Sequence, residues 1–118
     1  MAALPDAWHG QPGTRAPHVW ITQEGQRRST LDLFQRGWVL VTTDARWADA
    51  AADLPVAVSV IAGDDGCAVG RAFGIGDEGA SLVRPDGYIA WRVADFPADS
   101  RDALRRAFAA AAFTPGAR

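Results

Sequence analysis

The sequence predicts a single α/β domain in which helices flank one mixed β-sheet. Two apolar runs rich in β-branched residues, Trp38–Thr43 and Val56–Ala62, are joined by a helical pattern, which favours two parallel strands connected by a helix. Two shorter strand patterns and a last amphipathic helix pattern follow them. The chain has 118 residues, 48% of them hydrophobic and 22% charged, which is sufficient for one hydrophobic core.

The N-terminal part predicts an extension ahead of this sheet. Residues 1–17 contain three prolines and two glycines, which indicates an irregular lead-in or linker. From His18 to Leu31, two short strand patterns flank a polar tip and predict a β-hairpin with Gly25 at positive φ. The segment Leu31–Phe34 then makes at most one helical turn, which Gly37 ends.

The central elements follow from apolar periodicity. We expect Trp38–Thr43 to be a strand covered on both faces and Val56–Ala62 to be a second buried strand. Between them, Asp44 can cap a helix that runs through Asp53 and is ended by Pro55. Three side chains share the inward stripe of this helix: Trp47, Ala51 and Leu54.

The second half of the chain begins with a glycine-rich region. Residues 63–79 form a loop in our interpretation, with a short helix around Cys67–Phe73. The segments Ala80–Arg84 and Tyr88–Val93 then predict a hairpin. The sequence RPDG between them suits a type I turn, with Gly87 in the left-handed conformation that completes a bulged hairpin.

A helix from Pro97 to Phe113 ends the predicted fold, with Asp99 or Ser100 as its cap. Its periodicity buries Leu104, Phe108 and Ala111 and turns Arg101, Arg105 and Arg106 outward.

The predicted order of elements is hairpin, β, α, β, (α), β, β, α. This is the order of the thioredoxin fold with an N-terminal hairpin added. We therefore expect a lead-in over residues 1–17, a thioredoxin-like domain over residues 18–113 and a tail over residues 114–118.

A thioredoxin-like fold raises the question of redox chemistry. The dithiol would lie where the first central strand meets its helix, at Thr42–Trp47, and this segment contains no cysteine. Gly79-Ala80 also replaces the customary proline before the penultimate strand. The one cysteine, Cys67, falls in the glycine-rich loop and is interpreted as an incidental thiol. The alternative hypothesis is an independent thiol oxidoreductase or peroxidase-like protein acting through Cys67.

The segment Gly74–Gly79 matches the pattern G-x-G-x-x-G of dinucleotide-binding loops. That pattern needs a strand before it and a helix after it, whereas here a strand follows. Asp77 and Glu78 would in addition repel phosphates. We therefore expect a structural loop and no cofactor in this chain.

The remaining composition limits the classes of partner. A net charge of −2 gives no basic surface for nucleic acid or anionic membrane, and no apolar run approaches the roughly 20 residues that span a bilayer. His9, His18 and the pair Asp64-Asp65 lack further metal ligands at suitable spacing and are interpreted as solvated surface. A single cysteine fits a reducing compartment, so we expect a cytoplasmic protein.

The β-hairpin predicted near the C-terminus is the candidate interaction edge, with Arg84, Asp86, Tyr88, Trp91 and Arg92 as its residues. On a tight hairpin Arg92 could reach Asp86 or a carboxylate of a partner, although a turn-stabilising salt bridge is the commoner role of such charges. Four tryptophans lie on predicted elements: Trp20, Trp38, Trp47 and Trp91. Each is interpreted as a core residue, although so many large rings can also supply an interface.

Three segments together resemble a known family: PGTRAPHVWI, STLDLFQRGWVLVT and GASLVRPDGYIAWR. They are similar to the C-terminal domain of FAD-dependent aromatic-ring hydroxylases, a group that includes phenol hydroxylases and polyketide hydroxylases, and the resemblance spans Pro12–Phe113. It implies a thioredoxin-like domain without the dithiol, with the flavin and the substrate held by preceding domains. It further implies a non-catalytic accessory domain that packs against a flavoprotein hydroxylase body or a dimer mate.

Overall fold

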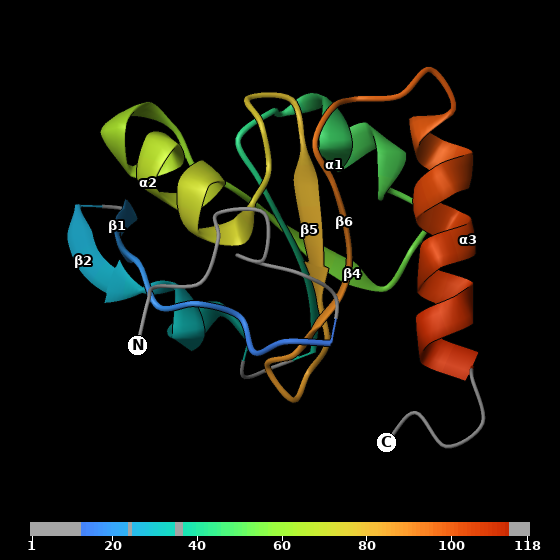
Figure 1. The fold of residues 1–118 in the computed structure, drawn as a ribbon, viewed down its shortest axis with the longest axis horizontal. Helices are drawn as coiled ribbons and strands as arrows, with labels where there is room; N and C mark the ends of the chain where they lie inside the picture. Colours follow the sequence, from blue (N-terminus) through green and yellow to red (C-terminus); the bar gives the residue numbers. More distant parts are fainter. Residues whose placement is uncertain (1–12, 24, 35–36, 114–118) are drawn as a thin grey trace, which may run out of the picture.

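The computed structural model describes residues 13–23, 25–34 and 37–113 of the chain (Figure 1). In chain order the elements are β1 (Trp20–Gln23), β2 (Gln26–Ser29), the 3-10 helix η2 (Thr30–Phe34), β3 (Trp38–Thr42), α1 (Arg46–Ala50), β4 (Val56–Val60), α2 (Gly63–Phe73), β5 (Ala80–Val83), β6 (Ile89–Val93) and α3 (Ser100–Phe113). The expected mixed sheet with flanking helices is confirmed, and most predicted elements are present with ends shifted by one to three residues.

The main sheet has four strands in the order β4-β3-β5-β6. β3 is parallel to β4, whereas β5 is antiparallel to both β3 and β6. Leu40 of β3 pairs with Leu82 of β5, which pairs with Trp91 of β6. Val39 pairs with Val83. Because successive side chains of a strand alternate in direction, these two rows face opposite sides of the sheet.

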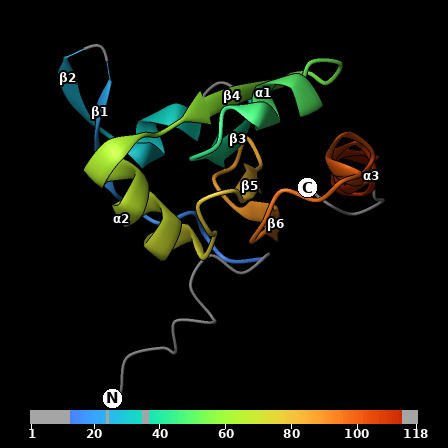
Figure 2. The ribbon, with the colours of Figure 1, turned by 90° about the horizontal axis from the view of Figure 1, so that it is seen from above.

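Each side of the sheet has its own apolar layer. Helices α1 and α3 cover one side (Figure 2), where the buried core residues are Leu40, Trp47, Ala50, Ala51, Ala80, Leu82, Leu104 and Phe108. Helix α2, the β1–β2 hairpin and η2 cover the other side, with Ile21, Phe34, Val39, Val41, Val69, Phe73, Val83 and Ile89 in the core. The sheet is thus buried between two layers, as an α/β architecture requires.

The second parallel strand was wrongly expected to be buried. β4 lies at the edge of the sheet and ends at Val60, which is 42% exposed. A β-branched apolar run does not by itself distinguish an edge strand from a central strand, since the neighbours decide the burial.

The two helices around β4 also differ from expectation. α1 covers only Arg46–Ala50. After it, Leu54 N donates to Ala51 O, three residues back, which is the tighter 3-10 pattern, and Pro55 disfavours a helical conformation of the residue before it. The short helix expected around Cys67–Phe73 is present as α2, but α2 begins at Gly63, so Cys67 lies within a helix and not in the glycine-rich loop. Position 66 of this helix requires glycine, because a Cβ there would lie 2.7 Å from the carbonyl oxygen of Ile61.

The β1–β2 hairpin is confirmed, with Gly25 at φ 78°. Ile21 anchors it in the core, and the Asp65 carboxylate accepts a hydrogen bond from Thr22 N at 2.8 Å. Asp65 is therefore a structural contact and not merely solvated surface. Trp20 on the same hairpin is 52% exposed, so its assignment to the core is wrong.

The predicted turn between β5 and β6 is confirmed. Gly87 N donates to Arg84 O at 2.9 Å and Arg84 N donates to Tyr88 O at 2.8 Å, while Gly87 has φ 86°. The described part of the lead-in, residues 13–17, forms no element but lies along this hairpin: Ala16 N donates to Gly87 O at 2.7 Å. Ala16 itself is buried in the core. Residues 1–12 and 114–118 of the predicted lead-in and tail lie outside the described residues.

In the part of the chain that the structure describes, no helix combines the length and the apolar character that crossing a bilayer requires.

Replacing Gly87 tests the turn. Gly87→Val should lower the free energy of unfolding by about 1–3 kcal/mol, because a β-branched residue is strained at this positive φ. Gly87→Asn is the matched control and should cost less, since asparagine tolerates the left-handed region. Urea unfolding of both variants measures the difference, and equal stability of Gly87→Val and wild type would contradict the turn assignment.

Candidate functional site

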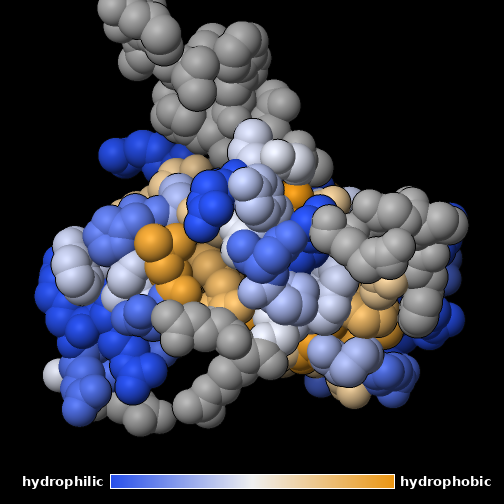
Figure 3. All heavy atoms as spheres, turned by 90° about the horizontal axis from the view of Figure 1, so that it is seen from below, coloured by the Kyte–Doolittle hydropathy of each residue, from blue (hydrophilic) through white to orange (hydrophobic). Residues whose placement is uncertain are grey.

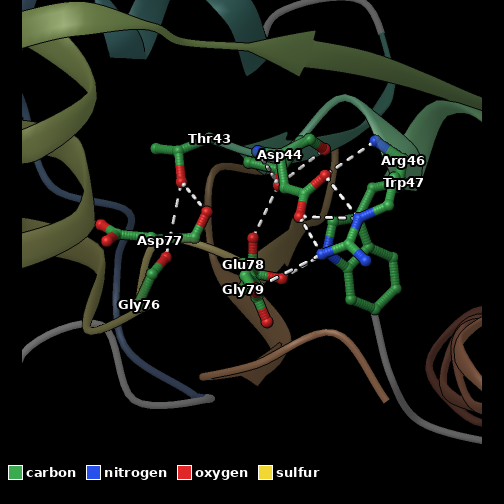
Figure 4. Close-up of polar contacts among 9 residues, drawn as sticks. Thr43, Asp44, Arg46, Trp47, Gly76, Asp77, Glu78 and Gly79 are labelled. Atoms are coloured by element: carbon green, nitrogen blue, oxygen red, sulfur yellow. Dashed lines mark hydrogen bonds and ion pairs between the residues drawn. The ribbon is translucent and has the colours of Figure 1, made fainter. Parts of the chain in front are cut away.

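The junction of β3 and α1 is the place where the predicted fold would carry a dithiol. Here three side chains donate to three consecutive backbone carbonyls of the 76–79 loop (Figure 4). Thr42 Oγ1 donates to Gly79 O at 2.6 Å and Thr43 Oγ1 donates to Asp77 O at 2.8 Å. Trp47 Nε1 donates to Glu78 O at 2.8 Å. These bonds satisfy carbonyls of a segment that has no regular secondary structure.

The glycines of the 76–79 loop allow the backbone to approach β6 closely. A Cβ on Gly79 would lie 2.3 Å from Val93 O, and one on Gly76 would lie 2.7 Å from Ala94 O. Gly74 ends α2 in the left-handed conformation, at φ 69°. The three glycines of the G-x-G-x-x-G match thus have structural roles, and the match is followed by a strand, as predicted.

The charged side chains at the junction pair with one another. Arg46 Nη2 lies 2.6 Å from Asp44 Oδ2 and 3.6 Å from Glu78 Oε2, and its guanidinium stands 4.2 Å from the centre of the Phe96 ring. The hydrogen bonds from Arg46 hold the pKa of Asp44 below the usual range of an aspartate. Arg46 thereby links the start of α1 to the 76–79 loop and to the segment after β6.

The side-chain donors of this junction are bonded within the protein. Both threonine hydroxyls and the Trp47 indole donate to the protein's own backbone, and no thiol or imidazole belongs to the segment Thr42–Trp47. Within the described ranges, no group of three or more His, Cys, Asp or Glu side chains is placed to hold a metal ion. Sequence reasoning identified the segment only by its missing cysteines, since a bond from a side chain to a distant carbonyl leaves no local pattern.

Cys67 lies nearer to this junction than the sequence indicated. Its exposed side chain lines a hollow of about 240 Å³ together with Thr43 and Asp77. The hollow opens beside the first turns of α2 and the end of β3. Among the residues that the structure describes, no histidine, lysine or arginine lines it, and such a residue is what usually stabilises a reactive thiolate.

The candidate interaction edge divides into separate parts. Asp86 bonds to Arg84 through two side-chain hydrogen bonds, and Tyr88 N donates to Asp86 Oδ1 at 3.1 Å. The bonds from Arg84 hold the pKa of Asp86 below the usual range. The predicted salt bridge on the turn therefore exists, with Arg84 as the cation.

Trp91 and Arg92 do not share this turn. Trp91 packs on Trp47, with ring centres 6.0 Å apart, in the layer that contains α1 and α3. Arg92 pairs with Ser81 and is directed toward the opposite side of the sheet, since neighbouring residues of a strand alternate. Arg15 instead joins the turn, with its guanidinium 5.3 Å from the Tyr88 ring centre. No sequence signal indicated that contact, because the lead-in carries no strand pattern.

Comparison with known proteins identifies the family. The sequence profile described as "Aromatic-ring hydroxylase, C-terminal" matches residues 9–111. This chain belongs to that family. The chain spans only about a fifth of the length of the relatives to which it is similar.

Similar members of the family act on aromatic compounds according to their names. Aklavinone 12-hydroxylase of Streptomyces purpurascens is 46% identical in an alignment of 106 positions, which covers 80% of this chain and 20% of that protein. The 4-methyl-5-nitrocatechol 5-monooxygenase of a Burkholderia species is 41% identical, over 86% of this chain and 21% of that protein. The structure of aklavinone-11 hydroxylase in complex with FAD and aklavinone aligns with a TM-score of 0.75 and 39% identity, covering 87% of this chain and 21% of that one.

The ion pair at the junction predicts a pH-dependent contribution to stability. Because the pKa of Asp44 is lowered on folding, its contribution is complete above about pH 4, the usual pKa of an aspartate, and is lost as the pH falls through the folded value. The stability difference between wild type and Asp44→Asn should therefore shrink on acidification. Urea unfolding over this pH range measures it.

Thr43→Val is the control for this experiment, because it removes a hydrogen-bond donor of the same junction without removing a titratable group. Its stability difference from wild type should stay constant with pH. A pH-independent difference for Asp44→Asn would contradict the role of the pair.

Proposed function

We propose that this chain is a non-catalytic accessory domain of the FAD-dependent aromatic-ring hydroxylase type, which packs against a flavoprotein hydroxylase body or a dimer mate. The observation that carries the proposal is the extent of the match. It includes most of this chain but only about a fifth of each relative. The flavin and the aromatic substrate of a complete hydroxylase would then be held by the other four fifths.

A thioredoxin-like fold without redox activity is part of the proposal. The strand order β4-β3-β5-β6 supports it, with a parallel pair joined through α1 and an antiparallel pair following. So does the arrangement of α1 and α3 on one side of the sheet and α2 on the other. The segment Thr42–Trp47 carries no cysteine. Its threonine hydroxyls already donate to carbonyls of the 76–79 loop and would therefore not bind a reactant.

The same reasoning gives the remaining parts of the proposal. A domain of this kind would act by contact with protein, not with nucleic acid or membrane, because its net charge is −2. A cytoplasmic location agrees with its single unpaired cysteine.

One observation favours a second candidate, a thiol enzyme acting through Cys67. The thiol is exposed and lines a hollow that also contains Thr43, so a small molecule could reach it. Against this, the described lining has no basic side chain to favour the thiolate, and the sequence has no second cysteine to resolve a disulfide. The accessory domain accounts for more of the structure.

The purified chain should neither bind FAD nor reduce disulfides. The Gly74–Gly79 run packs against the end of β6 and does not open a helix, so it offers no cradle for a pyrophosphate. Titration into free FAD should leave the flavin fluorescence unchanged. In the insulin reduction assay, wild type and Cys67→Ser should both match the rate without protein, with thioredoxin as the positive control.

Two outcomes would decide against the proposal. Stoichiometric FAD binding would place a cofactor site in this chain. Disulfide reduction by wild type that is lost in Cys67→Ser would establish the thiol enzyme instead.

A further inference from the structure

The described part of the lead-in, residues 13–17, crosses one face of the molecule between the two hairpins (Figure 1). Residues 13–16 lie beside the β5–β6 turn, where Gly13 N donates to Ile89 O at 2.8 Å, and the chain then continues into β1. In a protein of this family, whose matched region is described as C-terminal, a preceding body is joined to the fold through these residues. Such a connection keeps the body at high effective concentration near this face.

Exposed apolar side chains gather on the same face. Trp20 and Leu31 are 52% and 44% exposed, and they are two of the three large hydrophobic residues that the described chain exposes to this degree. Leu31 lines a hollow of about 230 Å³ with Arg15 and Pro85. Figure 3, in which the molecule is seen from below, shows a small group of apolar side chains on this side of the molecule. Ser29 lies between Leu31 and Trp20. Its Oγ accepts a hydrogen bond from Leu31 N at 3.1 Å, and Ser29 pairs with Trp20 across the β1–β2 hairpin.

Three arginines stack on the aromatic rings of this face. Arg15 and Arg84 lie 5.3 and 5.7 Å from the centre of the Tyr88 ring, and Arg27 lies 5.9 Å from that of Trp20. Arg84 is paired with Asp86, whereas Arg15 and Arg27 form no ion pair with any residue in the described ranges. Arginine, tyrosine and tryptophan are the residues that dominate binding energy at protein interfaces.

We propose that the hydroxylase body docks on this surface, which we call the lead-in face and define by Arg15, Trp20, Arg27, Leu31, Arg84 and Tyr88. The inference rests on the proposed accessory function and adds the surface and its chemistry. The body supplies an apolar side chain to the hollow beside Leu31 and carboxylates to Arg15 and Arg27. Arg84 and Tyr88 of the candidate interaction edge thus belong to the lead-in face, whereas Trp91 packs in the core layer of α1 and α3.

A chimera tests this surface with the whole chain in place. In it, this chain replaces the matched C-terminal region of aklavinone 12-hydroxylase from Streptomyces purpurascens, to which it is 46% identical over 106 residues. Amide hydrogen exchange is compared between the chimera and the isolated chain. We expect η2 and both hairpin turns to exchange about tenfold more slowly in the chimera, and β4 and the outer side of α3 to be unchanged.

Charge-reversing and polar substitutions then test the energetic contribution of the face. Leu31→Asp combined with Arg15→Glu should abolish the added protection, because it places carboxylates against an apolar and acidic surface. Val60→Asp is the matched control, since Val60 is 42% exposed but lies on β4, away from the lead-in. Thermal unfolding of each variant as an isolated chain verifies that it folds.

The outcomes separate the two proposals. Added protection confined to β4 or α3, or lost in Val60→Asp and kept in the double variant, would overturn the lead-in face while leaving the accessory function intact. Protection of the face that already occurs in the isolated chain and grows with its concentration would identify a second copy as the occupant and would overturn the choice of the body. No added protection anywhere would contradict the accessory function itself.

Discussion

Three consecutive carbonyls, those of residues 77–79, accept hydrogen bonds from Thr43, Trp47 and Thr42 in turn. These bonds join the end of β3 and the start of α1 to the segment that leads into β5. On its other side this segment lies against the end of β6, where Gly76 N donates to Ala94 O at 3.1 Å. The placement of this one loop thus affects four elements: β3, α1, β5 and β6. Trp47 also fills the centre of the layer under α1 and α3, so the same residue supports both the loop and the core.

The placement of this loop bears on function. In our proposal the fold is of the thioredoxin type, in which a dithiol would lie in the segment Thr42–Trp47, beside the 76–79 loop. Here the donors at the end of β3 are used by the protein's own backbone. The segment Thr42–Trp47 thereby connects β3 and α1 to the 76–79 loop, and the accessory role that we propose would use this connection only structurally. The exposed side chains of Arg15, Trp20 and Arg27 lie elsewhere, on the face crossed by the lead-in.

Elements that depend on local pattern could be predicted from the sequence. The bulged turn at Gly87 follows from the turn chemistry of RPDG, and β3 follows from its apolar run. Features that depend on neighbours could not. The edge position of β4 and the exposure of Trp20 reflect which elements pack beside them, which periodicity does not encode.

The candidate site shows the same division. The Arg84–Asp86 pair could be anticipated because the two residues share one tight turn, although Arg92 was considered as the partner of Asp86. The bonds from Thr42, Thr43 and Trp47 to residues more than thirty positions away could not be anticipated, because a backbone carbonyl has no sequence signature. The glycines at positions 76 and 79 were the available clue, since their spacing resembled a phosphate loop while their role is close approach to β6.

The most direct test of this account is the stability of Gly79→Ala. A Cβ at this position would lie 2.3 Å from Val93 O and 2.7 Å from Ala94 O, so the loop cannot keep its place against β6. Equilibrium urea unfolding should show a loss of about 1–3 kcal/mol or more, the usual cost of forcing an extra group into a packed site. Glu78→Ala, which changes an exposed neighbouring side chain, should cost no more than about 1 kcal/mol. A Gly79→Ala variant as stable as wild type would contradict the claim that the fold depends on the close packing of this loop against β6.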